Sequence, residues 1–327
     1  MEYIADSDRY NKMIYSRCGK SGIKLPAVSL GMWHNFGDQS SFSTAREMML
    51  GAFDLGISHF DLANNYGPSA GSAEEAFGKV ISEELRGYRD ELVVSTKAGY
   101  YMWPGPYGEW GSRKNLISSL DQSLRRMKLD YVDIFYHHRP DPETPMEETA
   151  DALAQIVRQG KALYIGISNY NPEQTTKMIE LLDRQGMHLL IHQLSHNMLG
   201  RQNEPVYDVL DKNGVGSIAF SPLAQGLLTD RYLYGIPEDS RAGGKSVFLS
   251  AASITPEKMR KVTELNNLAQ ERGQTLSQMA LAWVLQRATS VIIGASRLSQ
   301  IAENCKTTDN MQFSEEELGK IELILMS

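Results

Sequence analysis

Four side chains of different chemistry follow short apolar runs in the first half of the chain: Asp61, Tyr66, Lys97 and His138. A phenol has a pKa of about 10, so it holds its proton at neutral pH unless its surroundings intervene. A nearby ammonium such as Lys97 stabilises the phenolate and lowers that pKa. Asp61 would hold Lys97 in place and keep it charged, and His138 would orient a carbonyl oxygen beside the phenol. Together they would protonate a carbonyl oxygen while a hydride reaches the carbonyl carbon.

Each of the four also has an ordinary structural interpretation. Asp61 can cap a turn, Tyr66 can pack half-buried, and Lys97 can lie at the surface. A single histidine at a strand end is more often structural than catalytic. The chemical interpretation therefore depends on whether the fold brings the four side chains to one place.

The elements that would position them alternate along the whole chain. Short apolar runs typical of strands precede longer helical patterns. The predicted pairs are Val28–Trp33 with Thr44–Leu55, His59–Ala63 with Ala73–Leu85, Leu92–Lys97 with Asn115–Met127, Tyr131–His137 with Met146–Arg158, Tyr164–Ile167 with Pro172–Arg184, Leu189–Gln193 with Pro205–Lys212, Ser217–Phe220 with a long helical region, and Ser290–Ile293 with Leu298–Lys306.

Eight such pairs predict an α/β fold in which eight parallel strands close into a (β/α)8 TIM barrel. We expect a single domain over residues 1–327, with an extra C-terminal helix at Glu315–Leu325. Long loops are expected after the third and seventh strands, at Gly99–Lys114 and Arg231–Ser253. Capping-box spacing at Thr144–Glu147, Thr275–Gln278 and Ser314–Glu317 predicts three helix starts.

Active sites of such barrels form at the carboxyl ends of the strands. Polar residues follow almost every predicted strand at that position, which is hard to explain by core packing. Besides the four above they are Asn64, Asn65, His137, Arg139, Ser168, Asn169, His192, Gln193, Ser221, Gln225, Ser296 and Arg297. His137 is as plausible as its neighbour by composition, but adjacent strand residues point to opposite faces, so only one of the two enters the site.

Composition and charge limit the partners. The formal net charge is −7 and the isoelectric point is about 5.6, so a nucleic-acid partner is not expected. Two cysteines provide neither a disulfide framework nor a thiolate metal site, and no metal is predicted. No apolar run is long enough for a membrane span, and Met1–Tyr10 lacks the core of a signal peptide. We expect a cytoplasmic protein.

Two glycine patterns imitate phosphate-binding motifs. Gly214 and Gly216 lack the third glycine of a Rossmann fingerprint and precede their strand instead of following it. Gly243–Ser246 ends like a P-loop, but Asp239 stands where the first glycine is required. A nicotinamide cofactor would therefore have to be bound by a different arrangement.

The chain resembles the aldo-keto reductase family over roughly Tyr15 to Phe313. The resemblance rests on Phe60–Gly67, Ser95–Lys97, Asp133–His138, Gly166–Asn169, Phe220–Leu223 and Gly294–Arg297, which occur in the family's order. Within the family, Cys18–Gly22, Trp103–Gly108 and Leu223–Thr229 are most similar to bacterial enzymes that reduce L-glyceraldehyde 3-phosphate. The resemblance implies a catalytic tetrad of Asp61, Tyr66, Lys97 and His138, which agrees with the chemical interpretation.

The resemblance also implies a cofactor site for NADPH (NADP+). Ser168, Asn169 and Gln193 would hold the nicotinamide with Phe220 stacked on it, and Asp61, Trp33, Ser221, Leu223 and Gln225 would line the cleft. The motif of Gly294, Ser296 and Arg297, with Gln300 and Asn304, would bind the adenosine end, and Arg231 and Arg241 would assist at phosphate. Arg297 is the implied partner of the 2′-phosphate, since a guanidinium binds phosphate in a bidentate manner.

Three functions remain open at this stage. The first is NADPH-dependent reduction of small aldehydes such as L-glyceraldehyde 3-phosphate or methylglyoxal, by an enzyme that the resemblance implies is a homo-oligomer (tetramer or octamer). The second is a nicotinamide-sensing regulatory subunit, because β subunits of voltage-gated potassium channels resemble the chain; they carry asparagine where His138 stands, so His138 favours an enzyme. The third is a Schiff-base aldolase that uses Lys97.

Aromatic side chains are concentrated in the third loop. Tyr100, Tyr101, Trp103, Tyr107 and Trp110 lie within eleven residues of one another. They would either pack on a neighbouring loop or subunit, or form a wall of the carbonyl site.

Overall fold

A computed structural model describes residues 3–238, 240–244 and 249–327. Eight parallel strands form a closed barrel in the order β10-β3-β4-β5-β6-β7-β8-β9. They are β3 (Val28–Gly31), β4 (His59–Asp61), β5 (Val93–Ala98), β6 (Val132–His137), β7 (Ala162–Ser168), β8 (Leu189–Ser195), β9 (Gly216–Phe220) and β10 (Ser290–Ile293). The predicted (β/α)8 barrel is confirmed.

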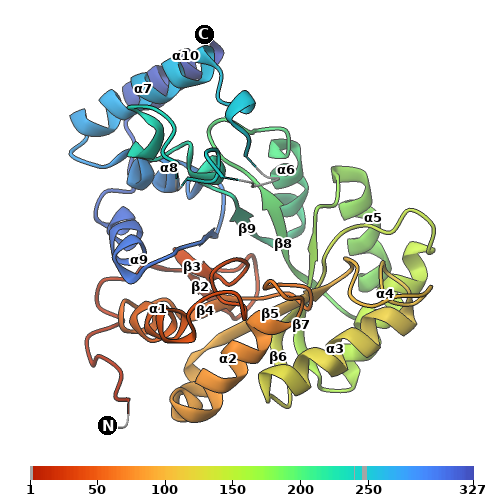
Figure 1. Ribbon diagram of the computed structural model, residues 1–327. Coiled ribbons are helices and arrows are strands. Elements are labelled where there is room, and N and C mark those ends of the chain that lie inside the picture. Colours follow the sequence, from red (N-terminus) through yellow and green to blue (C-terminus); the bar gives the residue numbers. More distant parts are fainter. Residues whose placement is uncertain (1–2, 239, 245–248) are drawn as a thin grey trace.

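Helices surround the barrel as an outer layer (Figure 1). They are α1 (Phe42–Asp54), α2 (Ser72–Glu83), α3 (Arg113–Met127), α4 (Met146–Arg158), α5 (Pro172–Asp183), α6 (Glu204–Asn213), α7 (Pro256–Glu271), α8 (Leu276–Val284), α9 (Leu298–Cys305) and α10 (Glu315–Met326). The long helical region expected after the seventh strand is two helices, α7 and α8. Short 3-10 turns occur at Arg86–Glu91, Ala224–Gly226, Asp230–Tyr232, Ala251–Ser253 and Lys306–Asp309.

Alternation along the strands separates two cores. Residues such as Val28, Leu30 and Phe60 face the helices and belong to the larger apolar core. A smaller cluster fills the barrel interior and includes Ile134, Tyr136, Leu190, Ile191, Ile218 and Ile292. Side chains that face inward at the carboxyl ends of the strands therefore converge above a packed interior.

A two-stranded hairpin that sequence analysis did not predict closes the amino-terminal end of the barrel. β1 (Tyr15–Arg17) pairs antiparallel with β2 (Lys24–Pro26). Cys18 and Leu25 are fully buried and pack with the interior cluster. The strands have three residues each, which is too short for a periodic pattern to reveal them. The hairpin seals the barrel at the end opposite to the polar residues.

Two of the three predicted capping boxes are present, at Thr275 before α8 and at Ser314 before α10. The box expected at Thr144 is wrong, because Pro145 is the N-cap of α4 and makes no side-chain cap. The turn before α4 is held instead by Asp141 Oδ1, which accepts hydrogen bonds from the backbone N–H groups of Glu143 (2.9 Å) and Thr144 (3.0 Å).

The two predicted long loops differ in how far they can be described. The loop after β5 runs up to α3, which begins at Arg113. The loop after β9 contains three of the short 3-10 turns. Residues 239 and 245–248, which include Lys245 and Ser246 of the P-loop-like Gly243–Ser246, lie outside the described residues.

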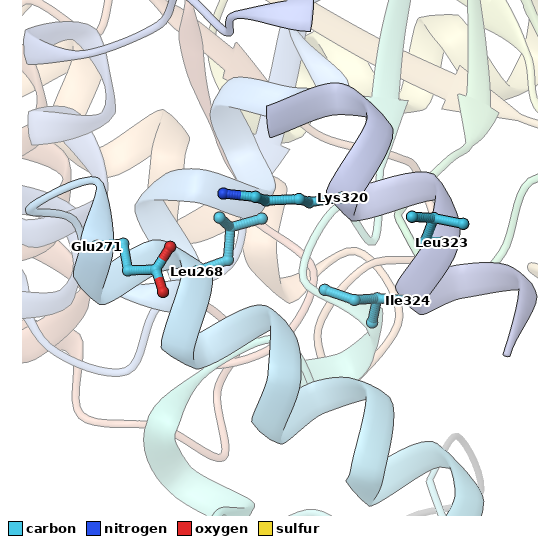
Figure 2. Close-up of a pocket in the computed structure, with 5 residues that line it drawn as sticks. All are labelled: Leu268, Glu271, Lys320, Leu323 and Ile324. Atoms are coloured by element: carbon cyan, nitrogen blue, oxygen red, sulfur yellow. The ribbon is translucent and has the colours of Figure 1, made fainter. Parts of the chain in front are cut away.

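A shallow pocket lies between α7 and α10 in the outer layer (Figure 2). Aliphatic side chains line it together with one acidic and one basic residue: Leu268, Leu323, Ile324, Glu271 and Lys320. None of these five residues follows a barrel strand, so the pocket is separate from the candidate site residues at the strand ends.

A buried carboxylate joins the barrel to two of its helices. Glu74 on α2 is fully buried, and its Oε1 accepts a hydrogen bond of 2.5 Å from Thr96 Oγ1 on β5. Its Oε2 lies 2.8 Å from Nε of Arg126 on α3. A buried charge that loses its partner is strongly destabilising, so this pair makes Arg126 necessary for the packing of α2 and α3 on the barrel.

Arg126→Met is therefore expected to lower the free energy of unfolding by about 3 kcal/mol, because it leaves the Glu74 carboxylate buried without its cation. Urea denaturation followed by circular dichroism measures the change. Arg260→Met is the matched control, since Arg260 pairs with Glu264 on an exposed face of α7, and it should cost less than about 0.5 kcal/mol. Equal losses in the two variants would contradict the assignment.

Candidate active site

A buried ion pair lies at the centre of the strand-end cluster. Lys97 on β5 is fully buried, and its Nζ lies 2.6 Å from Asp61 Oδ2 on the neighbouring strand β4. The same Nζ donates to the Leu62 carbonyl oxygen at 2.6 Å and to the Tyr66 hydroxyl at 3.3 Å. All three N–H bonds of the ammonium are thus directed to oxygen atoms. Burial lowers the pKa of Lys97, and the Asp61 carboxylate opposes that shift.

Asp61 is held by more than Lys97. Its Oδ1 accepts hydrogen bonds from Ser95 Oγ at 2.7 Å and from Gln193 Nε2 at 3.1 Å. The strand register explains this, because Asp61 pairs with Ser95 across β4 and β5. The carboxylate therefore receives donors from three directions and is fixed below the phenol.

The Tyr66 phenol lies in the loop after β4, above Lys97. Nζ of Lys97 is 4.7 Å from the centre of the Tyr66 ring, and the indole of Trp33 lies 6.4 Å from it. Burial raises the pKa of Tyr66 well above its usual value, and Asp61 and Tyr100 act in the same direction. The net shift of this pKa is therefore opposite to the lowering expected from Lys97, and burial is its largest cause. The phenol keeps its proton.

His138 follows β6 and faces the phenol. Its ring lies 5.8 Å from the Tyr66 ring and 4.6 Å from the Tyr100 ring, both in edge-on geometry. Burial lowers the pKa of His138 well below its usual value, and Lys97, His137 and Arg139 lower it further. The imidazole is therefore neutral at physiological pH and can donate a hydrogen bond from one nitrogen only.

His137 points to the opposite face, as alternation along the strand requires. Its Nδ1 lies 2.6 Å from the hydroxyl of Tyr170, and the backbone N–H of Tyr170 donates to His192 Nε2 at 3.3 Å. This outer cluster ties together the ends of β6, β7 and β8 behind the site. The sequence indicates His137 and His192 only as strand-end residues, and it does not predict a role for Tyr170, although Tyr170 directly follows Asn169.

Amide and hydroxyl groups follow β7 and β8 beside the tetrad. Ser168 and Gln193 are opposite each other in the register and are buried. Asn169 is exposed and adopts a left-handed backbone with φ of 63°. Its Nδ2 donates to the His138 carbonyl at 3.0 Å and to Ser168 Oγ at 3.1 Å. The structure thus brings the three predicted nicotinamide residues together with the tetrad.

The turn after β9 is conformationally strained. Ser221, Ala224 and Gln225 all have positive φ, a backbone conformation that residues other than glycine rarely adopt. Gln225 Nε2 donates to Ser221 Oγ at 2.9 Å, and Asn197 Nδ2 donates to the Ser221 carbonyl at 3.1 Å. Such strain persists only where the surroundings hold it, and it is concentrated at functional sites.

The partly exposed ring of Phe220 ends β9 just before this turn. Leu223 lies inside the turn and packs on the core. The guanidinium of Arg241 donates to Gln225 Oε1, so Arg241 joins this part of the predicted cofactor site. Arg231 lies exposed in the 3-10 turn Asp230–Tyr232.

The predicted adenosine site surrounds the start of α9. Ser296 is exposed, and its N–H and Oγ both donate to Gln300 Oε1, at 2.9 and 3.2 Å. Arg297 is the exposed N-cap residue of α9 and donates from Nε to Ser299 Oγ at 3.0 Å. The space beside Gly294 is open, because a side-chain Cβ at this position would have no heavy atom within 4 Å. Asn304, by contrast, is buried within the helix.

The loop after β5, which carries the aromatic residues, encloses the guanidinium of Arg139 next to the tetrad. The Arg139 guanidinium lies 4.2 Å from the Tyr100 ring centre and 3.7 Å from that of Trp110, and it pairs with Glu109. Tyr100 also contacts His138, so this part of the loop lies against the candidate site. Tyr101 and Tyr107 point outward and are exposed.

Among the described residues, no helix is long and apolar enough to cross a membrane. Over the same part of the chain, no group of three or more His, Cys, Asp or Glu side chains is arranged to hold a metal ion.

The chain is similar in sequence to a reductase and to a probable channel subunit, and in structure to a solved aldo-keto reductase. The chain is 56% identical to L-glyceraldehyde 3-phosphate reductase of Escherichia coli (strain K12), covering 98% of this chain and 95% of that protein. It is 37% identical to a probable voltage-gated potassium channel subunit beta of Arabidopsis thaliana, covering 96% and 97%. A crystal structure of a thermostable aldo-keto reductase in complex with the inhibitor epalrestat superposes with a TM-score of 0.75 at 30% identity, covering 95% of this chain and 100% of the other.

The model of the aldo/keto reductase family matches residues 27–325, which is the barrel with its helices. The matched region contains all four members of the tetrad and every predicted cofactor residue. This chain belongs to the aldo/keto reductase family.

Proposed function

We propose that the protein is an NADPH-dependent reductase of small aldehydes in which Tyr66 is the proton donor. The observation that carries this proposal is the position of Lys97 Nζ, 2.6 Å from Asp61 and 3.3 Å from the Tyr66 hydroxyl. A protonated phenol beside a fixed ammonium suits proton transfer to a developing alkoxide, because the ammonium stabilises the phenolate that remains.

The residues of the described cluster fit a nicotinamide cofactor. Ser168, Asn169 and Gln193 supply the hydroxyl and amide groups that a carboxamide requires, and the ring of Phe220 is partly exposed at the end of β9. NADPH, when bound, supplies the hydride. Asn169, held by His138 and Ser168, would keep the nicotinamide beside the tetrad.

The start of α9 suits the phosphate of NADPH. Backbone N–H groups of a first helical turn and an exposed guanidinium together form an anion site. Arg297 and Ser296 are both exposed there, and Gly294 leaves open space beside them. We therefore assign Arg297 to the 2′-phosphate, with Ser296 and Gln300 beside it.

The chain's own residues then perform the proton transfer. The aldehyde oxygen lies between the Tyr66 hydroxyl and the neutral His138 imidazole, which orients it by a hydrogen bond. Tyr66 donates its proton to that oxygen as negative charge develops on it. Lys97 stabilises the phenolate, and Asp61 keeps Lys97 charged and in place.

The identity to the Escherichia coli reductase supports L-glyceraldehyde 3-phosphate as the first substrate to test, with methylglyoxal as a second small aldehyde. The aldolase alternative loses support. A Schiff base requires an accessible amine, whereas Lys97 is fully buried and its N–H groups are directed to Asp61, Leu62 and Tyr66.

The similarity to an Arabidopsis potassium channel subunit beta favours a second candidate, a nicotinamide-sensing subunit with a slow redox step. The two functions differ in turnover with free aldehyde. Many rapid turnovers without a stably bound partner in pull-down assays would count against a sensor. A single slow turnover would count against the reductase.

Tyr66→Phe is expected to lower kcat/KM for the aldehyde by about 10²–10⁴-fold, since it removes the proton donor but keeps the ring. Loss of NADPH absorbance with L-glyceraldehyde 3-phosphate and with methylglyoxal measures this. NADPH binding, followed by fluorescence, should be unchanged. The control is Tyr234→Phe, because Tyr234 is 97% exposed. Unaltered turnover in the Tyr66 variant would refute the assignment.

Arg297→Met is expected to weaken NADPH binding by about 10- to 100-fold and to leave NADH binding nearly unchanged, because a charge-assisted contact with the 2′-phosphate is lost. Titration of the variant with each nucleotide measures the effect. Arg260→Met, on the exposed face of α7, serves as the control for lost surface charge. Equal weakening for both nucleotides would place Arg297 away from the 2′-phosphate.

A further inference from the structure

A chain of hydrogen-bonded side chains runs down the barrel interior from the active site. Ser95 Oγ, which donates to Asp61, lies 3.0 Å from His59 Nε2. His59 Nδ1 lies 2.9 Å from Ser29 Oγ, and Ser29 Oγ lies 2.7 Å from Ser290 Oγ. The chain crosses strands β5, β4, β3 and β10, and each of these side chains is at most 1% exposed.

The Asp61 carboxylate sets the direction of this chain. A carboxylate paired with Lys97 only accepts hydrogen bonds, so the single hydroxyl proton of Ser95 is directed to Asp61 Oδ1. Ser95 Oγ must then accept from His59, which requires a proton on Nε2. Whether the other ring nitrogen, Nδ1, donates or accepts depends on whether the imidazole is charged.

His59 is neutral in this position. Burial lowers its pKa to about 4, with Asp61 opposing the shift and Lys97 adding to it. A neutral imidazole that carries its proton on Nε2 accepts at Nδ1, so Ser29 donates to His59 and Ser290 donates to Ser29. The groups facing His59 are thus Ser29 from β3 and Ser95 from β5, with the charges of Asp61 and Lys97 beyond.

The opposite direction is also available to the same atoms. Ser290 Oγ lies 3.4 Å from the Ala27 carbonyl oxygen, which can serve as a terminal acceptor. With a proton on Nδ1, His59 would donate to Ser29, Ser29 to Ser290, and Ser290 to Ala27. The choice between the two directions therefore depends on the Ser95–Asp61 end of the chain.

We propose that His59 is a positioning residue of the active site, locked in the Nε2-protonated form, which acts through Ser95 to fix the Asp61 carboxylate that holds Lys97. The kinetic part of this inference rests on the proposed reductase function. The tautomer does not, and it is measured without substrate or turnover.

Nitrogen-15 NMR of the histidine ring tests the direction of the chain. We expect a neutral His59 with its proton on Nε2, unchanged between about pH 6 and pH 9 because its pKa lies far below that window. Absence of the signal in His59→Gln assigns the resonance among the seven histidines of the chain. A proton on Nδ1 in the unmodified protein would overturn the proposal.

Ser95→Ala provides the second arm. It removes the acceptor at Nε2, and the proton is expected to move to Nδ1, because a buried donor without a partner is less tolerated than a buried acceptor. Ser290→Ala is the matched control at the far end and should leave the proton on Nε2. A tautomer that stays the same in Ser95→Ala would show that Asp61 does not set it.

Kinetics separate positioning from a purely structural role. His59→Leu should lower kcat about five- to tenfold, the equivalent of one lost hydrogen bond, with less than about a twofold change in the aldehyde KM. The alkaline limb of the pH–kcat profile of this variant should move to lower pH. A less firmly held Asp61 would counteract the effect of burial on the pKa of Lys97 less well. His59→Gln, whose amide can donate to Ser95 and accept from Ser29, should restore both properties.

Equal kcat and equal pH profiles in His59→Leu and the unmodified protein would overturn the positioning role. If the unmodified protein reduces no aldehyde, the proposed function fails by itself. The NMR arms then still decide whether the hydrogen-bonded chain runs toward Asp61.

Discussion

The structure depends on one electrostatic constraint, an ammonium that is fully buried at the top of a β-barrel. Removing a charge from water costs several kcal/mol unless a counter-charge and hydrogen bonds replace the solvent. Lys97 meets that requirement with Asp61, the Leu62 carbonyl and the Tyr66 hydroxyl. The arrangement leaves the ammonium little freedom, so the phenol that completes its coordination is also fixed. The same interactions that make the charge tolerable therefore place the phenol that we propose as the proton donor.

The barrel makes this arrangement possible because parallel strands bring inward-facing residues from neighbouring strands to one level. Asp61 is opposite Ser95, and Ser168 is opposite Gln193, so carboxylate, hydroxyl and amide groups meet without any loop having to span the site. The β1–β2 hairpin seals the other end with Cys18 and Leu25. The hydrogen-bonded side chains that run through His59 are thereby shielded from water, which would otherwise compete for their hydrogen bonds.

Periodicity predicted the barrel, and strand-end chemistry indicated the four side chains that the structure brings together, because both signals are local in sequence. What they missed depends on tertiary contacts. The three-residue strands of the hairpin are too short to show a pattern, and Tyr170 acquires a role only through its contact with His137, thirty-three residues away. The direction of the pKa shift at Tyr66 was also wrong, since sequence shows that an ammonium is near but not how deeply the phenol is buried. Thr144 failed as a cap because the Asp141 side chain already organises that turn.

Burial favours the uncharged form of Tyr66, Lys97 and His138. The phenol of Tyr66 stays protonated and the imidazole of His138 stays neutral, while Asp61 counters the same tendency at Lys97. The charge of the site is therefore confined to the Lys97–Asp61 pair. A phenol that will not ionise spontaneously, placed 3.3 Å from a fixed ammonium, releases its proton only when a stronger base forms beside it. In the proposed reaction the alkoxide that develops from the carbonyl would be such a base, and the ammonium of Lys97 would stabilise the phenolate that remains.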